Sequence, residues 1–552
     1  MTLAIQSHEW LYLLGGLTWV FFAFAFGACV GSLTNVLVYR LPLGLSVVTP
    51  PSRCPSCGTQ LAWKDNIPVL GWLALGGRCR YCRTRISPEY PLVEAFVGLL
   101  FVVAFAICYF AENPVFAEWR VLGISWKTIQ PDWAAPGFAR TWPIFVVQLT
   151  LLSCLVAMTL VDAKTYTIPL VLTWVPAVAG VVGLTAYAAW FEFVGSRRIS
   201  STIWADGWSY AIATPGPHGW KWVGAAIGGV AGLGISLLLV RLKLLSRSFA
   251  DYDQWAASRT PESTAPSTEA GTAQSSEGAT EASEASEHSP PDAASASPRG
   301  MSAKWVVLAG VLVAAGAAGA IVAPRFGFIR FGGVLFGVLV GAIVGAIAVR
   351  ALGLGPPPED ESGEPAADAP TEEWLDYPHA RREVIREVLY LAPCLGLAVV
   401  GAAVAMQIGG PWSFHDFTGA RVAATPVPLW LDALSGSLMG YLIGGGVVWA
   451  VRILGSLLFG KEAMGLGDVH MMAAVGACLG WIDPVLAFFL AAFVGVYREI
   501  LSRIWSGAAR RAMPFGPSLA AATVIVLFGK PWIEDGINRW MHRTPEQRIE
   551  LP

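Results

Sequence analysis

Long apolar runs alternate with short polar segments along most of the chain, and their lengths predict membrane-spanning helices. A helix that crosses the hydrocarbon core of a bilayer needs about 20 mostly apolar residues. The pattern predicts an all-α polytopic membrane protein with about 12 transmembrane helices. The expected spans are 10–39, 90–111, 141–161, 169–191, 219–242, 303–324, 329–352, 385–407, 429–458, 468–481, 485–500 and 514–532.

Two polar segments differ from ordinary loops. Residues 256–300 consist largely of Ser, Thr, Ala, Glu and Pro, and contain no Leu, Ile, Val or aromatic residue. Residues 354–376 are acidic and rich in proline. Neither segment can bury enough apolar surface to offset the entropy of ordering. We therefore predict that both are flexible linkers.

The apolar and polar segments together predict six parts of the chain. The loop that follows the first span is polar, and the two linkers lie in a long region between two groups of spans. The parts are a first helix at 1–39, a loop domain at 40–89, helices at 90–191, an inserted region at 192–428, helices at 429–532 and a polar tail at 533–552.

Composition and charge support the membrane assignment and set the orientation. The chain is 55% hydrophobic and 14% charged, with a mean hydropathy of +0.55. A net charge of −2 argues against nucleic acid as a partner. Residues 1–9 contain no Lys or Arg, so the first span is expected to be retained rather than cleaved as a signal peptide. The 40–89 loop is strongly basic and is therefore expected in the cytoplasm.

The cysteines of this loop predict a metal site. Cys54 and Cys57 form one C-x-x-C pair, and Cys79 and Cys82 form a second. Two such pairs are typical of zinc ribbons, in which four thiolates bind one tetrahedral ion. A disulfide is the alternative, but the cytoplasm keeps thiols reduced. We expect a structural Zn²⁺ here, and we interpret the five other cysteines as small buried hydrophobic residues.

Two acidic residues stand at expected membrane boundaries. Asp468 follows Gly465 and Gly467 at the start of an apolar run, and Asp162 ends the third span. Acids at membrane depth are costly and are functional candidates by default. The alternative is structural: each acid could cap a helix start, and Asp162 could pair with Lys164.

The number of spans places both acids at the same membrane face. Four expected spans separate their regions, and an even number returns the chain to the same side. Two adjacent carboxylates share one proton, so that one can act as base and the other as acid in peptide hydrolysis. On these residues alone, the catalytic pair and the structural interpretation both remain open.

Several further motifs resemble one family. The chain is similar to bacterial type IV prepilin peptidases, which are leader peptidases and N-methyltransferases with a G-x-G-D motif. The matching motifs cover about 20–191 and 430–520. They are Gly31–Val36 with Tyr39–Pro42, the paired cysteines, Asp65–Val69 with Gly71 and Trp72, Tyr90–Glu94, Asp162 with Ile168 and Pro169, Gly465–Asp468, and Pro514–Pro517.

This resemblance implies a complete function. Asp162 and Asp468 match the catalytic aspartates of an intramembrane aspartic peptidase, and Glu94 matches an acid near the methyltransferase region. The implied substrates are prepilins and pseudopilins, cut after a glycine at the cytoplasmic face of the bacterial inner membrane. S-adenosyl-L-methionine would then methylate the new N-terminus. Glu94 could instead pair with Arg83 or Arg85.

The chain also departs from the family pattern. Ala463 and Leu466 stand where glycines are common, and His470 stands where a lysine is usual. His470 could face the catalytic pair or simply the lipid headgroups. Region 192–428 is an addition to the family pattern, and we expect it to form a separate unit of four helices on the flexible linkers.

Two other classes of function also fit a multi-pass chain. One is a proton-coupled transporter or channel, whose intramembrane acids would relay protons. The other is an inactive scaffold for pilus or secretion assembly. The lipid bilayer is the expected surroundings in every case, and no feature of the sequence indicates an oligomeric state.

Overall fold

The computed structural model describes residues 9–117, 120–121, 124–195, 219–249, 380–408, 412–414, 421–423, 427–459, 462–506 and 514–542. The chain divides into two compact units. One consists of Met1–Leu237 with Tyr390–Pro552, and the other of Leu238–Leu389. Both predicted linkers and the predicted spans 303–324 and 329–352 lie outside the described residues.

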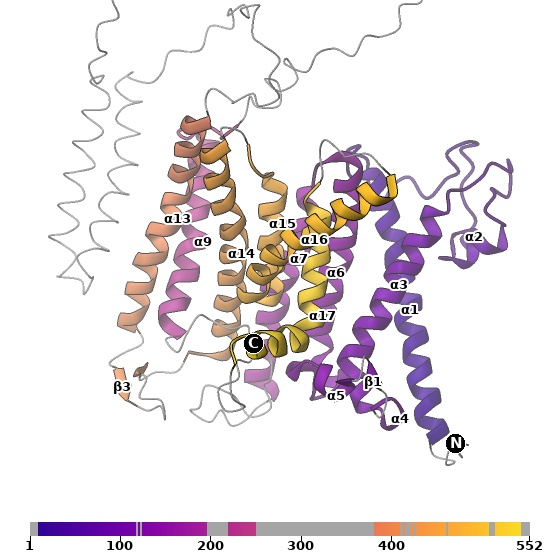
Figure 1. Cartoon of the computed structure of the whole chain (residues 1–552), viewed down its shortest axis with the longest axis horizontal. Helices are drawn as coiled ribbons and strands as arrows, with labels where there is room; N and C mark the ends of the chain where they lie inside the picture. Colours follow the sequence, from indigo (N-terminus) through magenta and orange to yellow (C-terminus); the bar gives the residue numbers. More distant parts are fainter. Residues whose placement is uncertain are drawn as a thin grey trace, which may run out of the picture. The chain divides into compact units, whose positions relative to one another are not determined.

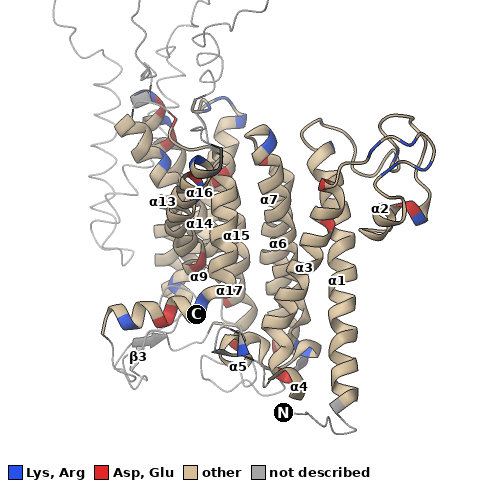
Figure 2. Cartoon of the chain, turned by 45° about the vertical axis from the view of Figure 1, so that its right-hand side comes forward, with Lys and Arg blue, Asp and Glu red and all other residues tan. Residues whose placement is uncertain are grey.

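The first unit is built from long apolar helices (Figure 1). Lys, Arg, Asp and Glu side chains gather towards the ends of these helices, and the helix bodies are largely uncharged (Figure 2). Within the described residues, 9 helices are long and apolar enough to cross a bilayer. The prediction of a helical, multi-pass membrane protein is therefore confirmed.

The N-terminal group of helices begins with α1 (Glu9–Arg40) and α3 (Glu89–Tyr109), which pack along each other. Gly31 makes this approach possible, because a Cβ there would lie 2.7 Å from Glu94 Cα. The loop between the two helices contains η1 (Trp63–Asn66) and α2 (Leu70–Ala74).

Short elements lead from α3 to the third long helix, α6 (Phe138–Thr165). They are η2 (Phe110–Glu112), α4 (Pro114–Ala117), a hairpin of β1 (Arg120–Val121) and β2 (Ile124–Ser125), α5 (Trp126–Ile129) and η3 (Asp132–Ala134). The fourth apolar segment follows Pro169, as expected for proline before a first helical turn. It consists of α7 (Leu170–Val178), the π-helical η4 (Ala179–Leu184), α8 (Thr185–Trp190) and η5 (Phe191–Gly195).

Helices α9 (Gly219–Arg241) and α13 (Ala380–Ile408) pack backbone against backbone over part of their lengths. Gly224 lies against Gly401, and Gly232 lies against Pro393. Small residues allow such close helix contacts in membranes. A hairpin of β3 (Trp412–Phe414) and β4 (Arg421–Ala423) follows α13.

The C-terminal group contains α14 (Leu429–Phe459), α15 (Leu466–Leu479), α16 (Ile482–Ser506) and α17 (Gly516–Trp540). Helix α15 is short, and most of its residues are buried between its neighbours. Gly440 and Gly444 of α14 approach its backbone closely, and so does Gly180 of η4. The element that carries Asp468 is therefore enclosed by other helices rather than by lipid.

The described residues of the second unit tie the segment after α9 to the start of α13. Ser248 Oγ donates to the Glu387 carboxylate at 3.1 Å, and the Phe249 N–H donates to Glu383 Oε2 at 2.9 Å. Arg386 completes the group with an ion pair to Glu383 at 2.5 Å. These contacts bring residues 249 and 383 together, although 133 residues lie between them in the sequence.

Candidate functional site

The cysteine loop contains two knuckles with the same backbone fold. In each, the N–H of the first cysteine donates to the carbonyl of a threonine: Cys54 to Thr59 at 3.0 Å, and Cys79 to Thr84 at 2.9 Å. The residue after the second cysteine is left-handed in both, Gly58 at φ +69° and Arg83 at φ +60°. The turn points both sulfurs of each pair towards one centre.

The four sulfurs are placed as a metal ion requires. The Sγ atoms of Cys54, Cys57, Cys79 and Cys82 all lie within 4.8 Å of one another. Cys54 Sγ and Cys82 Sγ are 3.7 Å apart, and a tetrahedral zinc site with Zn–S bonds of about 2.3 Å needs about 3.8 Å between sulfurs. All four cysteines are free thiols. The set therefore fits a tetrahedral metal ion.

Hydrogen bonds within the loop favour thiolate ligands. Hydrogen bonds between Cys82 and Thr84 lower the pKa of Cys82 to about 6. Asp65 and Arg80 form an ion pair at 2.5 Å beside the second knuckle, and this hydrogen bond holds the pKa of Asp65 below its usual value. The ion pair joins η1 to the knuckle, so the loop folds around the sulfurs.

Asp162 lies in the last turn of α6 and is buried, with 6% exposure. Its Oδ2 faces the start of α17, where a Cβ at Gly516 would lie 2.5 Å away. The charge of Arg498, from α16, also acts on this carboxylate. Lys164 forms its ion pair with Glu89, at 3.1 Å, and not with Asp162. Asp162 lies at the end of α6, but its carboxylate faces the N-terminus of α17 and interacts with the Gly516 backbone there.

Asp468 lies in the first turn of α15. Gly465 is the N-cap of this helix, so Asp468 does not cap it. The Asp468 and Asp162 carboxyl groups are near enough for the charge of one to act on the other. The backbones meet as well, because Gly467 lies against Ile168 in the loop that follows α6, where a Cβ at 467 would be 3.0 Å from Ile168 Cβ. The structure therefore brings the two predicted aspartates together.

The two glycines before Asp468 have different surroundings. Gly467 is needed for the close approach to Ile168. Gly465 has a φ of −69°, which any residue can adopt, and the nearest atom to a Cβ there would be 3.9 Å away. Leu466 is 40% exposed. Gly465 and Leu466 are thus exposed, whereas Gly467 packs against Ile168.

Glu94 and His470 lie outside this pair. Glu94 is buried in α3, and its Oε2 accepts a hydrogen bond of 2.7 Å from the N–H of Val69. Glu94 therefore anchors the cysteine loop to α3. Its partner in this loop is the Val69 backbone, and not the side chain of Arg83 or Arg85. His470 is half-buried and, among the described residues, makes no hydrogen bond or ion pair with either aspartate.

Arg498 and Gly516 are residues of this site that the sequence did not identify. Gly516 belongs to the Pro514–Pro517 motif, which the resemblance singles out without assigning it a role. Arg498 donates to the Pro514 carbonyl at 2.8 Å and so connects α16, this motif and Asp162. In the sequence Arg498 indicates only the orientation of α16, because nothing in its local pattern predicts a contact with α6.

Comparisons with known proteins identify the relatives of this chain. Residues 25–108 match the family model described as the bacterial peptidase A24 N-terminal domain. A prepilin leader peptidase/N-methyltransferase of Myxococcus xanthus is 59% identical over 80 residues, which are 14% of this chain and 24% of that protein. No solved structure matches the chain.

Longer matches cover more of the relatives at lower identity. The protein of the same name from Klebsiella pneumoniae is 48% identical over 92 residues, 16% of this chain and 40% of that protein. The one from Pectobacterium carotovorum is 30% identical over 213 residues, 34% of this chain and 65% of the relative. The chain thus matches between about a quarter and two thirds of the length of these relatives. By its N-terminal domain and by these matches, the chain is related to the bacterial prepilin leader peptidase/N-methyltransferases.

Proposed function

We propose that this protein is an intramembrane aspartic peptidase that removes the leader of type IV prepilins and pseudopilins. The observation that carries the proposal is that Asp162 and Asp468 lie near each other, although their helices are far apart in the sequence. An exposed segment of chain lies beside them. The relatives are named prepilin leader peptidases, and these names supply the class of substrate.

The proposed chemistry uses the two carboxyl groups with one shared proton. The ionised carboxylate takes a proton from a water molecule, whose oxygen attacks the carbonyl carbon of the scissile peptide. The protonated partner donates to the carbonyl oxygen. When the tetrahedral intermediate collapses, the C–N bond breaks. The leaving nitrogen takes the proton that the first carboxylate removed from water, and a hydroxyl of the intermediate returns a proton to the partner carboxylate.

We propose that the substrate binds beside Gly465 and Leu466. This segment is accessible, and it immediately precedes Asp468. An extended leader peptide could lie along this backbone and present the bond after its glycine to both acids. The basic cysteine loop supports an orientation with this end of the helices in the cytoplasm of a bacterial inner membrane.

We further propose a structural Zn²⁺ held by Cys54, Cys57, Cys79 and Cys82, because their sulfurs fit its geometry. The ion would stabilise the loop and take no part in proteolysis. One zinc per chain, measured under reducing conditions in pure protein, is the expected result. The names of the relatives also extend the proposal to N-methylation, for which the family resemblance implies S-adenosyl-L-methionine as the methyl donor.

The proposal is tested by two substitutions that keep side-chain size. Asp162→Asn and Asp468→Asn should each reduce cleavage of a prepilin in membrane vesicles by more than about a thousandfold, because each removes one half of the acid–base pair. The thermal unfolding of the purified proteins should change little. Normal cleavage by either variant would disprove the aspartate mechanism.

A further inference from the structure

Arg452 is an unusual residue for a membrane helix. It lies in the C-terminal part of α14, and its exposed fraction is 0%. A guanidinium that is buried in a bilayer-spanning segment is costly unless its charge and its N–H donors are satisfied. The residues that satisfy Arg452 therefore indicate why this position carries an arginine.

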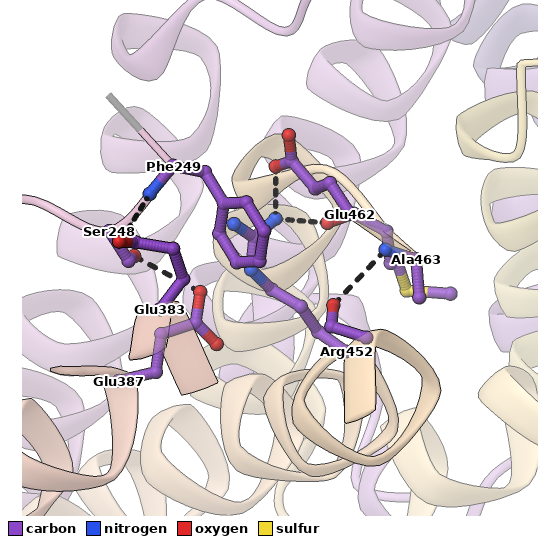
Figure 3. A network of polar contacts seen from close by, with 9 residues as sticks. Ser248, Phe249, Glu383, Glu387, Arg452, Glu462 and Ala463 are labelled. Carbon is purple, nitrogen blue, oxygen red and sulfur yellow. Dashed lines mark hydrogen bonds and ion pairs between the residues drawn. The ribbon is translucent and has the colours of Figure 1, made fainter. Parts of the chain in front are cut away.

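Two of the groups that contact Arg452 belong to the segment that leads into α15. Arg452 Nη1 forms an ion pair of 2.5 Å with Glu462 Oε1 and also donates to the carbonyl of Met464 (Figure 3). One helical turn further, Ser456 Oγ accepts a hydrogen bond of 3.2 Å from the N–H of Ala463. One face of α14 thus holds the three consecutive residues Glu462–Met464, which we call the entry segment.

Gly455 completes this face. A Cβ at Gly455 would lie 2.6 Å from the Cβ of Ala463, which is too close for any side chain at both positions. The absence of a side chain at Gly455 therefore allows Ala463 to lie against the helix. Ala463 is also a position where the resemblance expects glycine, so Gly455 compensates for this difference.

The entry segment determines where Asp468 lies. Met464 immediately precedes Gly465, the N-cap of α15, and Asp468 is in the first turn. On its other side this turn is fixed by the contact of Gly467 with Ile168, which follows Asp162 in the chain. We infer that Arg452 is a positioning residue, which holds the entry segment and so sets the distance between Asp468 and Asp162. The inference rests on the proposed function.

The first test does not depend on any activity. Hydrogen exchange, followed by mass spectrometry on the full chain in detergent, reports the protection of amides 462–470. Arg452→Gln should accelerate exchange in this peptide at least tenfold and leave peptides of α17 unchanged. Arg503→Gln is the matched control, because Arg503 forms only an exposed ion pair with Glu499 on α16. Unchanged exchange at 462–470 would overturn the inference.

If Arg452→Gln does not fold, Ser456→Ala provides the same test. It removes only the acceptor for the Ala463 N–H, so exchange at Ala463 should still accelerate. Exchange that stays at the wild-type rate in Ser456→Ala would count against a fixed entry segment.

The second test measures cleavage. Arg452→Gln should lower kcat by about 10- to 100-fold with KM changed less than threefold, since a displaced catalytic group acts on the chemical step. The separation between the acid and alkaline limbs of the pH profile should also change, because it depends on the distance between the coupled acids. Arg452→Lys should be intermediate, because an ammonium lacks the guanidinium fork. A fall in folded protein with wild-type kcat and pH profile would show a structural role only.

A rescue variant strengthens the second test. Gly455→Ala should lower kcat, and Gly455→Ala combined with Ala463→Gly should restore it, because the second change removes the methyl group that clashes. Failure of the pair to recover would contradict the inference. If the wild-type chain itself cleaves no prepilin, the proposed function fails, whereas the exchange experiment still tests the entry segment.

Discussion

At the scale of single residues, the environment of Asp162 gives a role to the Pro514–Pro517 motif, which the family resemblance identifies without a role. Gly516 follows Pro514 and Phe515 at the start of α17, and its missing side chain leaves room for the Asp162 carboxylate. Arg498 ties the same turn to α16. The motif therefore shapes one wall of the candidate site.

Substitution of Gly516 by alanine tests this role. The new methyl group would lie 2.5 Å from Asp162 Oδ2 and should displace the carboxylate, with an expected loss in kcat of about 10- to 100-fold. Gly529→Ala on the same helix is the control, because its nearest neighbour would be 3.9 Å away, at ordinary contact distance. Equal rates for the two variants in a prepilin cleavage assay would contradict the assigned role of Gly516.

At the scale of elements, the two cysteine knuckles are equivalent in fold but not in sequence. Gly58 adopts its left-handed conformation without cost, whereas Arg83 adopts it with a side chain. We therefore expect Gly58→Ala to destabilise the metal-bound loop by about 1 kcal/mol, and Arg83→Gly to leave it unchanged or slightly more stable.

The measurement is the release of metal to a chelator, followed with a chromogenic indicator. Faster release from Gly58→Ala than from wild type is expected, with no acceleration for Arg83→Gly. The opposite order would show that the Arg83 side chain, rather than the backbone turn, controls the stability of this knuckle.

The helices, and the places of Asp162 and Asp468 in helix end turns, could be predicted from the sequence for physical reasons. Runs of about 20 apolar residues have few structures open to them in lipid, and an acid beside such a run is conspicuous. The two C-x-x-C pairs similarly predict that four sulfurs cluster around one centre. Asp162 and Asp468 were expected on one face because the count of spans fixes the side of each helix end.

The packing around the site could not be predicted in this way. Arg452, Arg498 and Gly516 act through contacts between helices that are distant in sequence, and no local period reveals such contacts. The predicted span 468–481 is a 14-residue helix in the structure, starting at Leu466. It is buried among other helices, and an apolar run gives no indication of whether lipid or protein surrounds it.

At the scale of the whole molecule, the candidate site belongs to one compact unit. Asp162, Asp468, Arg498 and Gly516 all lie within Met1–Leu237 and Tyr390–Pro552. We therefore propose that region 250–379 is not needed for cleavage. Residues 249 and 383 are joined by a hydrogen bond of 2.9 Å, so a short connection can replace the chain between them.

This proposal is tested by replacing residues 250–379 with about 12 Gly and Ser residues, which behave as a flexible chain. The shortened protein should insert into membranes and cleave prepilin within about threefold of the wild-type rate. A folded but inactive protein would place an essential element in the replaced region. A matched variant that also carries Asp468→Asn gives the background rate.

The central claim is that Asp162 and Asp468 together cut a prepilin. Mass spectrometry of the N-terminus of a co-expressed prepilin tests it most directly, since it reports cleavage and methylation in one spectrum. With the wild-type chain, we predict a pilin that begins directly after the leader glycine and carries one added methyl group. With Asp162→Asn or Asp468→Asn, we predict the intact leader. An intact leader with the wild type, or a processed pilin with either variant, would contradict the account.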